Sequence, residues 1–308
     1  MSVGLATDLD DAAAEFTAVR RQLFGVAYRM LGSVAEAEDV VQDAWVRWQG
    51  MDRSEVVKPQ AFLTTMVTRL AINVLQSARV RRETYTGPWL PEPVDTSQDP
   101  TLGAERAEAL ELAVLVLLER LTPTERAAYV LREAFGYEYG EIADVVQVSQ
   151  VAARQLVSRA RKHLAAGKRN TVGRDEKRRL LEAFVAAARS GDVAQLERLL
   201  AADVVSTSDG GGAVRNVSRF PVAGRSTVAK FVRAFATRFW SGIEAHAIEV
   251  NGEAAIALER DGATVAVMTV AASDDGIDQI LWVMNPAKLE ALERGGPALP
   301  PQVPDRRA

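Results

Sequence analysis

The stretch TYTGPWLPEPVDTSQDPT, residues 84–101, constrains the fold of this chain more than any other feature, because it contains four prolines. Proline fixes its own φ and lacks the backbone N–H that a helix interior needs, so a helix cannot run through this stretch. On both sides of it, apolar residues recur at spacings of three and four, which is the pattern of amphipathic helices. The sequence therefore predicts two all-α modules, residues 15–83 and 109–168, joined by a linker over residues 84–108.

The first module is predicted to contain three helices. Gly32 interrupts the first apolar pattern, and Ser33 with Glu36 has the spacing of a capping box that opens the second helix. The third helix follows Pro59 and runs toward Arg82. In the second module, Thr122, Pro123 and Glu125 have the order of an N-cap, a first helical residue and an acid in the first turn.

Charge is unevenly distributed along the chain, although the net charge is only −4. Four acids and no base lie between residues 36 and 43, and six bases and no acid lie between residues 154 and 169. This separation is typical of a chain that binds both a polyanion and a basic partner.

The first module offers two candidate binding surfaces. An acidic helix face suits a basic protein partner, and a basic helix end suits a DNA strand. A solvated helix face is the alternative in each case. The acidic face contains Glu36, Asp39 and Asp43, and the basic end contains Asn73, Gln76, Ser77, Arg79, Arg81 and Arg82.

Two short helices of the second module have the pattern of a helix-turn-helix. They span Tyr139 to Val146 and Ser149 to about Leu164, with two residues between them. Guanidinium groups pair with guanine edges or phosphates, and glutamine pairs with adenine, so the polar face of the second helix suits a major groove. A solvated helix in a small bundle is the alternative. After the N-cap Ser149, this face carries Gln150, Arg154, Gln155, Arg159, Arg161 and Lys162.

Residues 174–294 change to a pattern that predicts an α+β domain. Two helical patterns precede four strand-like runs at 243–250, 253–260, 263–271 and 277–284. Asn251-Gly252 and Asp261-Gly262 are turn signals of two-residue β-hairpins. We therefore expect an antiparallel sheet packed under helices. Residues 295–308 are predicted to be disordered.

Composition argues against several classes of protein. The chain has no cysteine, which excludes disulfides and thiol nucleophiles, and it has only two histidines. A metal site or a cofactor site is therefore not expected. The first residues lack the apolar core of a secretory signal, and no apolar run approaches about 18 residues. We expect a cytoplasmic protein without a membrane segment.

Three stretches resemble regions 2 and 4 of extracytoplasmic-function (ECF) sigma factors. They are AEAEDVVQDAWVRW (35–48), AFLTTMVTRLAINVLQSARVRR (61–82) and LTPTERAAYVLREAFGYEYGEIADVVQVSQVAARQLVSRARKHL (121–164). The resemblance implies that the chain binds core RNA polymerase through its β′ and β subunits and directs transcription from promoter DNA. It further implies that Asp39, Gln42 and Asp43 bind the β′ subunit. Residues 73–82 would engage the −10 element, and the helix from Ser149 would read the −35 element.

A stand-alone helix-turn-helix repressor is the competing class. Such a repressor would bind duplex DNA tightly by itself, whereas a sigma factor is expected to need core polymerase for tight specific binding.

Three further motifs resemble the markers of the SigJ-like subgroup, which carries a fused SnoaL-like domain. They are GPWLPEPV (87–94), SDGGG (208–212) and NPAKL (285–289). The resemblance implies a cone-shaped α+β domain that touches the linker and modulates transcription. The implied regulatory residues are Trp89, Leu90, Pro91, Asp209, Gly210, Gly211, Gly212, Asn285, Pro286 and Lys288. In the subgroup a lysine follows the glycines, where this chain has Ala213, so we expect that charge to be absent or displaced, for example to Arg215.

A catalytic C-terminal domain is the other alternative, because some SnoaL-like relatives are cyclases or isomerases. The glycine run lacks the spacing of a Walker or dinucleotide loop. Over a plain surface turn, we favour a loop at the mouth of the pocket that contacts the linker or the NPAKL segment. His246 alternates with Ile248 along a strand and is expected to face inward, but no tight acid–base pair with Glu244, Asp209 or Asp278 is evident. We therefore predict no catalytic residues, and leave a small-molecule ligand of the pocket open.

Overall fold

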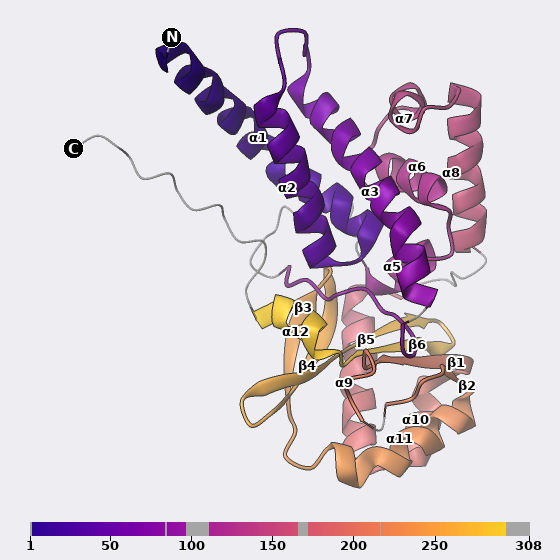
Figure 1. The fold of residues 1–308 in the computed structure, drawn as a ribbon. Coiled ribbons are helices and arrows are strands. Elements are labelled where there is room, and N and C mark those ends of the chain that lie inside the picture. The colour runs from indigo at the N-terminus through magenta and orange to yellow at the C-terminus, as the bar shows by residue number, and fades with distance from the viewer. Residues whose placement is uncertain (1, 84, 97–110, 166–171, 216, 294–308) are drawn as a thin grey trace.

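The computed structural model describes residues 2–83, 85–96, 111–165, 172–215 and 217–293. Figure 1 shows the helices of the N-terminal half above the α+β half. The helices are α1 (Ser2–Leu31), α2 (Val34–Gly50), α3 (Pro59–Glu83), α5 (Leu112–Leu118), α6 (Pro123–Glu133), α7 (Tyr139–Val146), α8 (Gln150–Ala165), α9 (Arg174–Ser190), α10 (Val193–Leu199), α11 (Arg225–Phe239) and α12 (Pro286–Glu293). The strands are β1 (Leu200–Asp209), β2 (Val222–Ala223), β3 (Glu244–Val250), β4 (Glu253–Arg260), β5 (Ala263–Ser273) and β6 (Gly276–Val283).

The helix starts follow from the capping residues in the sequence. The Ser33 hydroxyl accepts a hydrogen bond from the Glu36 N–H (3.3 Å) at the start of α2. Thr122 and Glu125 form a complete capping box at the start of α6. In the helix-turn-helix, Gln147 ends α7 with φ of 57°, so the chain turns within two residues before Ser149 caps α8. The predicted capping positions are confirmed.

The two helical modules pack directly on one another and share one hydrophobic core. Arg126 of α6 is buried, and its guanidinium donates to the carbonyl of Met30 at 2.6 Å. Arg69 of α3 donates to the carbonyls of Asp144 and Val145 at 2.9 and 3.0 Å. These carbonyls lie at the C-terminal end of α7, where backbone acceptors lack helical partners. Residues 73–82 of α3 and the helix α8 therefore belong to one compact body.

The C-terminal domain contains a six-stranded sheet with the order β2-β1-β6-β5-β4-β3. The sheet is mixed, because β1 runs parallel to β6, with Ser206 opposite Ile280. The predicted antiparallel pairing is confirmed for β3 to β6, whereas the parallel strand β1 was missed. The hairpin turns are confirmed, since Asn251 and Gly252 have φ of 56° and 75°. Residues of α9, α10 and α11 form a core with one face of the sheet, and the linker and α12 cover part of the other.

The described part of the linker, residues 85–96, is not helical, as expected. It passes between the helical half and the α+β half (Figure 1). Leu90 is buried against Leu281 and Leu289 of the C-terminal domain, and Asp95 pairs with Val250 of β3 in an isolated bridge. On the other side, Gly32 leaves room for the ring of Trp89, since a Cβ there would lie 2.8 Å from it. The linker is thus packed from both sides.

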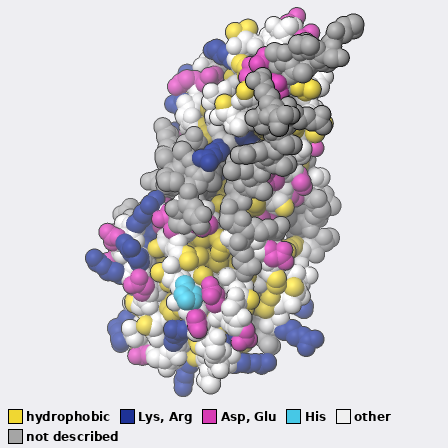
Figure 2. Space-filling model, turned by 90° about the vertical axis from the view of Figure 1, so that its left-hand side faces the viewer, with side chains coloured by type: hydrophobic (Ala, Val, Ile, Leu, Met, Phe, Trp, Pro, Cys, Tyr) yellow, Lys and Arg dark blue, Asp and Glu magenta, His cyan; other side chains and the backbone are white. Residues whose placement is uncertain are grey.

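Figure 2 shows one face of the molecule, on which acidic and basic side chains surround apolar ones in the α+β half. Among the helices that the structure describes, none has the length and apolar character to cross a bilayer. The predicted disordered segment, residues 295–308, lies outside the described residues.

Candidate functional site

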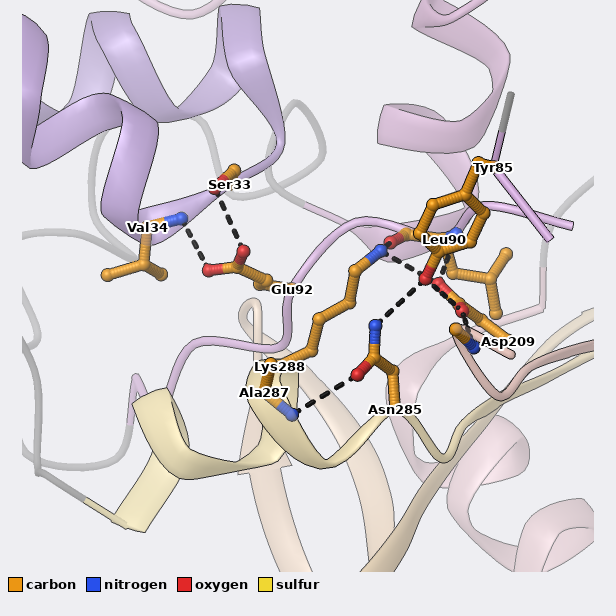
Figure 3. Close-up of polar contacts among 10 residues, drawn as sticks. Ser33, Val34, Tyr85, Leu90, Glu92, Asp209, Asn285, Ala287 and Lys288 are labelled. Atoms are coloured by element: carbon orange, nitrogen blue, oxygen red, sulfur yellow. Dashed lines mark hydrogen bonds and ion pairs between the residues drawn. The ribbon is translucent and has the colours of Figure 1, made fainter. Parts of the chain in front are cut away.

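Segments that lie far apart in the sequence meet at one buried carboxylate, Asp209 at the end of β1 (Figure 3). Its Oδ1 accepts hydrogen bonds from the Tyr85 hydroxyl (2.6 Å) and the Gly211 N–H (3.0 Å). Its Oδ2 accepts from the Leu90 N–H (2.9 Å) and from Lys288 Nζ (2.7 Å). We call the group of Tyr85, Leu90, Asp209, Asn285 and Lys288 the latch, because it joins the linker to the C-terminal domain.

Lys288 supplies the positive charge of the latch. Its side chain is 7% exposed, and Nζ also donates to the Leu90 carbonyl and lies 4.2 Å from the centre of the Trp89 ring. A buried charge pair is tolerated when hydrogen bonds satisfy its remaining donors and acceptors. Ala213 and Arg215 are both exposed, so the cation beside Asp209 comes from α12 and not from Arg215.

The glycine run permits close backbone approach at two points. Gly211 has φ of 58°, and a Cβ there would lie 2.4 Å from the Asn285 carboxamide nitrogen. Gly212 has φ of 75°, and a Cβ there would lie 3.0 Å from the Cβ of Thr86. The loop therefore contacts both the linker and the start of α12. Gly210 in turn faces Val217 within the same loop.

Asn285 completes the latch at the start of α12. Its Nδ2 donates to the Tyr85 hydroxyl at 2.9 Å, and its Oδ1 accepts from the Ala287 N–H at 3.1 Å, just after the exposed Pro286. Burial, together with the hydrogen bond to the Asp209 carboxylate, raises the pKa of the Tyr85 hydroxyl. Tyr85 therefore stays protonated and donates to Asp209.

Glu92 joins the linker to the first helical module, a role that the sequence did not indicate. Its carboxylate accepts from the Val34 N–H (2.6 Å) and the Ser33 hydroxyl (2.8 Å) at the N-terminus of α2. The helix dipole favours an anion at that end. Burial raises the pKa of Glu92, although the hydrogen bonds from Val34 and Ser33 oppose the shift. The buried Pro91 packs beside it, against Gly32.

Asn251 makes a second connection that sequence reasoning missed. Its side chain accepts from the Val94 N–H (3.0 Å) and donates to the Tyr28 hydroxyl of α1 (2.7 Å). Asparagine is common in hairpin turns, so its presence at this position did not indicate any further contact. The linker is thereby bonded to both halves of the molecule within a few residues.

The residues predicted to contact the −35 element lie on α8. Ser149, Gln150, Arg154 and Gln155 are exposed. Two arginines of the same helix are held by carboxylates of α6: Arg159 by Glu125 at 3.0 Å and Arg161 by Glu133 at 2.7 Å.

These ion pairs also affect ionisation. The hydrogen bonds that Arg161 donates to the Glu133 carboxylate raise the pKa of Arg161. Burial alone would raise the pKa of Glu125, but hydrogen bonds from Thr122 and Arg159 lower it overall.

The other predicted surfaces lie on α2 and α3. Asp39, Gln42 and Asp43 are exposed and Glu36 is half-buried on α2, opposite its buried residues Val40 and Trp48. On α3, the side chains of Asn73, Gln76 and Ser77 are exposed. Arg79, Arg81 and Arg82 lie within α3, but their side chains are outside the described residues.

Of the residues considered for catalysis, His246 and Glu244 lie together, whereas Asp209 and Asp278 lie elsewhere in the domain. The expectation that His246 faces inward was wrong. Its side chain is 47% exposed on the edge strand β3, with the carboxylates of Glu244 and Glu259 at 3.6 and 3.5 Å. An edge strand has a neighbour on one side only, which leaves this end of β3 open. Asp209 is occupied by the latch, and Asp278 lies on β6. Within the described residues, no group of three or more His, Asp or Glu side chains is arranged to hold a metal ion.

Family models and known proteins match the helical half of the chain. The family model "Sigma-70 region 2" matches residues 16–81, and "Sigma-70, region 4" matches residues 111–164. The chain is 41% identical over 235 residues to the ECF RNA polymerase sigma factor SigJ of Mycobacterium tuberculosis, which covers 75% of each protein. It is 31% identical over 208 residues to the probable ECF sigma factor SigI of the same species, which covers 65% of this chain and 70% of SigI.

A solved structure is also similar over nearly the whole chain. The crystal structure of M. tuberculosis SigJ has a TM-score of 0.74 and 34% identity, and the match covers 91% of this chain and 99% of that one. The helix-turn-helix, the polar helix faces and these matches lead to one assignment. The chain belongs to the ECF RNA polymerase sigma factors, which direct transcription initiation.

Proposed function

We propose that the C-terminal α+β domain controls transcription by this sigma factor, by holding or releasing the linker between regions 2 and 4. The observation that carries the proposal is the latch. The Asp209 carboxylate binds Tyr85 and Leu90 of the linker on one side and Lys288 of α12 on the other. A release of the linker requires this buried network to open as a unit.

The length of the linker explains why docking matters. The −10 and −35 elements are about 25 base pairs apart, or about 85 Å at ~3.4 Å per base pair. A compact chain of 308 residues has a radius of gyration of only about 19 Å. Region 2 and region 4 therefore have to separate before α3 and α8 reach both elements together.

Docking of residues 85–96 shortens the available tether. With these residues held, residues 97–110 span at most about 50 Å at ~3.6 Å per residue. With the linker released, residues 84–110 span about 90–97 Å when fully extended. Release of the latch thus roughly doubles the maximum reach of the tether. Coupling of this kind requires about 1–3 kcal/mol between states.

In the separated form, each helical surface has a proposed role. The acidic face of α2, with Asp39, Gln42 and Asp43, binds the β′ subunit of core polymerase. The end of α3 engages the −10 element. The face of α8 that begins at Ser149 reads the −35 element, and Arg159 and Arg161 exchange their α6 carboxylates for DNA.

Transcription in vitro with purified core polymerase tests the proposal. A chain that ends at residue 284 lacks α12 and with it Asn285 and Lys288, whereas a chain that ends at residue 293 keeps the latch. We expect the 1–284 chain to transcribe more than the full chain from a fixed promoter, and the 1–293 chain to match the full chain. Equal transcription from all three would rule the proposal out.

A further inference from the structure

A groove beside the latch is lined by three arginines and no carboxylate. It has a volume of about 310 Å³ and lies between the end of α11, the turn that follows the glycine run, the β4–β5 turn and α12. Its basic residues are Arg215, Arg238 and Arg260. Apart from Thr264, the rest of its lining is apolar. A surface of this kind favours a ligand that is both anionic and apolar.

An aromatic recess of about 80 Å³ adjoins the groove, between α11 and the sheet. The residues that line both spaces are Val217, Phe235, Phe239 and Met284. Deeper in, the recess is lined by Phe231, Trp240 and Trp282. The indole N–H of Trp282 already donates to Ser206 (3.1 Å), so this wall offers a ring face and not a donor.

The guanidinium groups are available at the entrance. Arg260 is oriented by a hydrogen bond to the Phe239 carbonyl (2.7 Å). Arg215 and Arg238 are exposed, and neither is bonded to another side chain in the described part of the chain. A larger groove of about 690 Å³, between α9 and strands β3 and β4, differs because acids such as Glu249 line it together with bases such as Arg178. The larger groove therefore has mixed charge, whereas the smaller groove has only positive charge.

We propose that the groove and recess form a binding site for a small amphipathic carboxylate. Guanidinium forks match the geometry of a carboxylate, and ligand sites combine apolar walls with a few polar groups that fix orientation. The carboxylate lies among the three arginines, and an aromatic ring or short alkyl chain enters the recess. With about 80 Å³, the recess admits at most about one ring, so the rest of the apolar part lies in the groove.

The site lies directly behind the latch. The Met284 N–H donates to the Asp209 carbonyl at 2.8 Å, and Pro286 and Leu289 of α12 also line the groove. A bound carboxylate therefore contacts the elements that present Asp209 and Lys288. An effect of the ligand on transcription rests on the proposed function, whereas binding itself does not.

Calorimetry on the full chain tests the site with naphthoate as the probe and its uncharged analogue naphthylmethanol as the comparison. We expect naphthoate to bind more tightly than naphthylmethanol. Arg215→Gln and Arg238→Gln should each weaken naphthoate binding by about three- to tenfold, as expected for the loss of one charge-assisted contact. Both should leave naphthylmethanol binding unchanged, which also shows that the recess is intact. Arg178→Gln, in the larger groove, is the matched control and should change neither.

Absence of naphthoate binding at millimolar concentration would overturn the proposal. Naphthoate affinity that is unchanged in both arginine variants, or that falls equally in Arg178→Gln, would overturn it as well. Retention of binding in Arg238→Lys, which keeps the charge, would support it. If naphthoate binds as expected but the transcription test above fails, the site stands and only its link to transcription is lost.

Discussion

At the scale of single residues, the buried pair of Asp209 and Lys288 determines how the linker is held. Exposure of their side chains is 0% and 7%, so neither charge has water to replace a lost partner. The sequence motifs predicted that both residues belong to a regulatory contact. They did not indicate that Lys288 pairs with Asp209, because the two lie on elements that only the sheet brings together. Glu92 was missed because its partners, Ser33 and Val34, lie far from it in the sequence.

Removal of the Asp209 charge should therefore lower the stability of the folded protein. We expect Asp209→Asn to lower the free energy of unfolding by about 3–5 kcal/mol, because it leaves the Lys288 ammonium buried without its counter-ion. Urea denaturation measures the loss. Glu176→Gln is the control, since it breaks the exposed pair with Arg179 and should cost about 1 kcal/mol or less. Equal losses would contradict the buried-pair account.

The glycine run allows a sharper comparison. Gly211→Ala should destabilise the protein more than Gly242→Ala, because both residues have positive φ (58° and 70°) but only Gly211 faces a neighbour, Asn285. The backbone strain common to both is about 1–2 kcal/mol, and the excess at Gly211 reports the close approach. Urea denaturation of the two variants gives the difference. If Gly242→Ala cost as much, the contact with Asn285 would have no energetic role.

At the scale of secondary-structure elements, the spacing of apolar residues predicted most of the helices and strands. Capping residues and hairpin turns marked the starts of α2 and α6 and the strands β3 to β6. The apolar spacing of α11 was present in the sequence and was overlooked. Strand β1 could not be predicted from a pattern of apolar residues, because its C-terminal end is polar. Ser206 and Asp209 are buried there only because Trp282 and Lys288 supply partners from distant parts of the chain.

A charge cluster joins three elements and should make stability depend on pH. Lys177 of α9 lies 3.3 Å from Glu111, just before α5, and 3.2 Å from Glu253 of β4. Burial and the nearby Glu253 carboxylate raise the pKa of Glu111 to about 7. In the folded state Glu111 then binds its proton more tightly than in the unfolded state. The resulting contribution to stability is present at low pH and is lost as pH rises from about 4.5 through 7.

Glu111→Gln should remove this part of the pH dependence. We expect the stability of the unsubstituted protein, measured relative to that of Glu111→Gln, to fall between pH 5 and pH 8. The urea midpoint at several pH values measures it, and the exposed Glu182→Gln serves as the control. A difference that stays constant over this range, or that grows in favour of the unsubstituted protein, would contradict the assigned shift.

At the scale of the whole molecule, the sequence predicted separate modules but not their packing. Arg126 and Arg69 tie region 2 to region 4 through backbone carbonyls, and such bonds leave no pattern in the sequence of the acceptor. The linker then lies between the helical half and the sheet. The closed arrangement is therefore a property of long-range contacts, and any open state has to break them together with the latch.

A reversible covalent lock tests whether the linker must leave the C-terminal domain. The chain has no cysteine, so two introduced cysteines form a defined pair. Thr86→Cys with Gly212→Cys places the two Cβ atoms 3.0 Å apart, so the glycine loop has to shift by about 0.5 Å to reach the usual range of about 3.5–4.5 Å for a bridge. When oxidised, the bridge holds the linker on the glycine run. Transcription should then fall well below that of the same protein after reduction, because the bridge keeps the linker on the C-terminal domain. The single variant Gly212→Cys controls for strain at positive φ, and transcription from it should not respond to reduction. Equal transcription by the oxidised and reduced double variant would show that initiation proceeds with the linker docked.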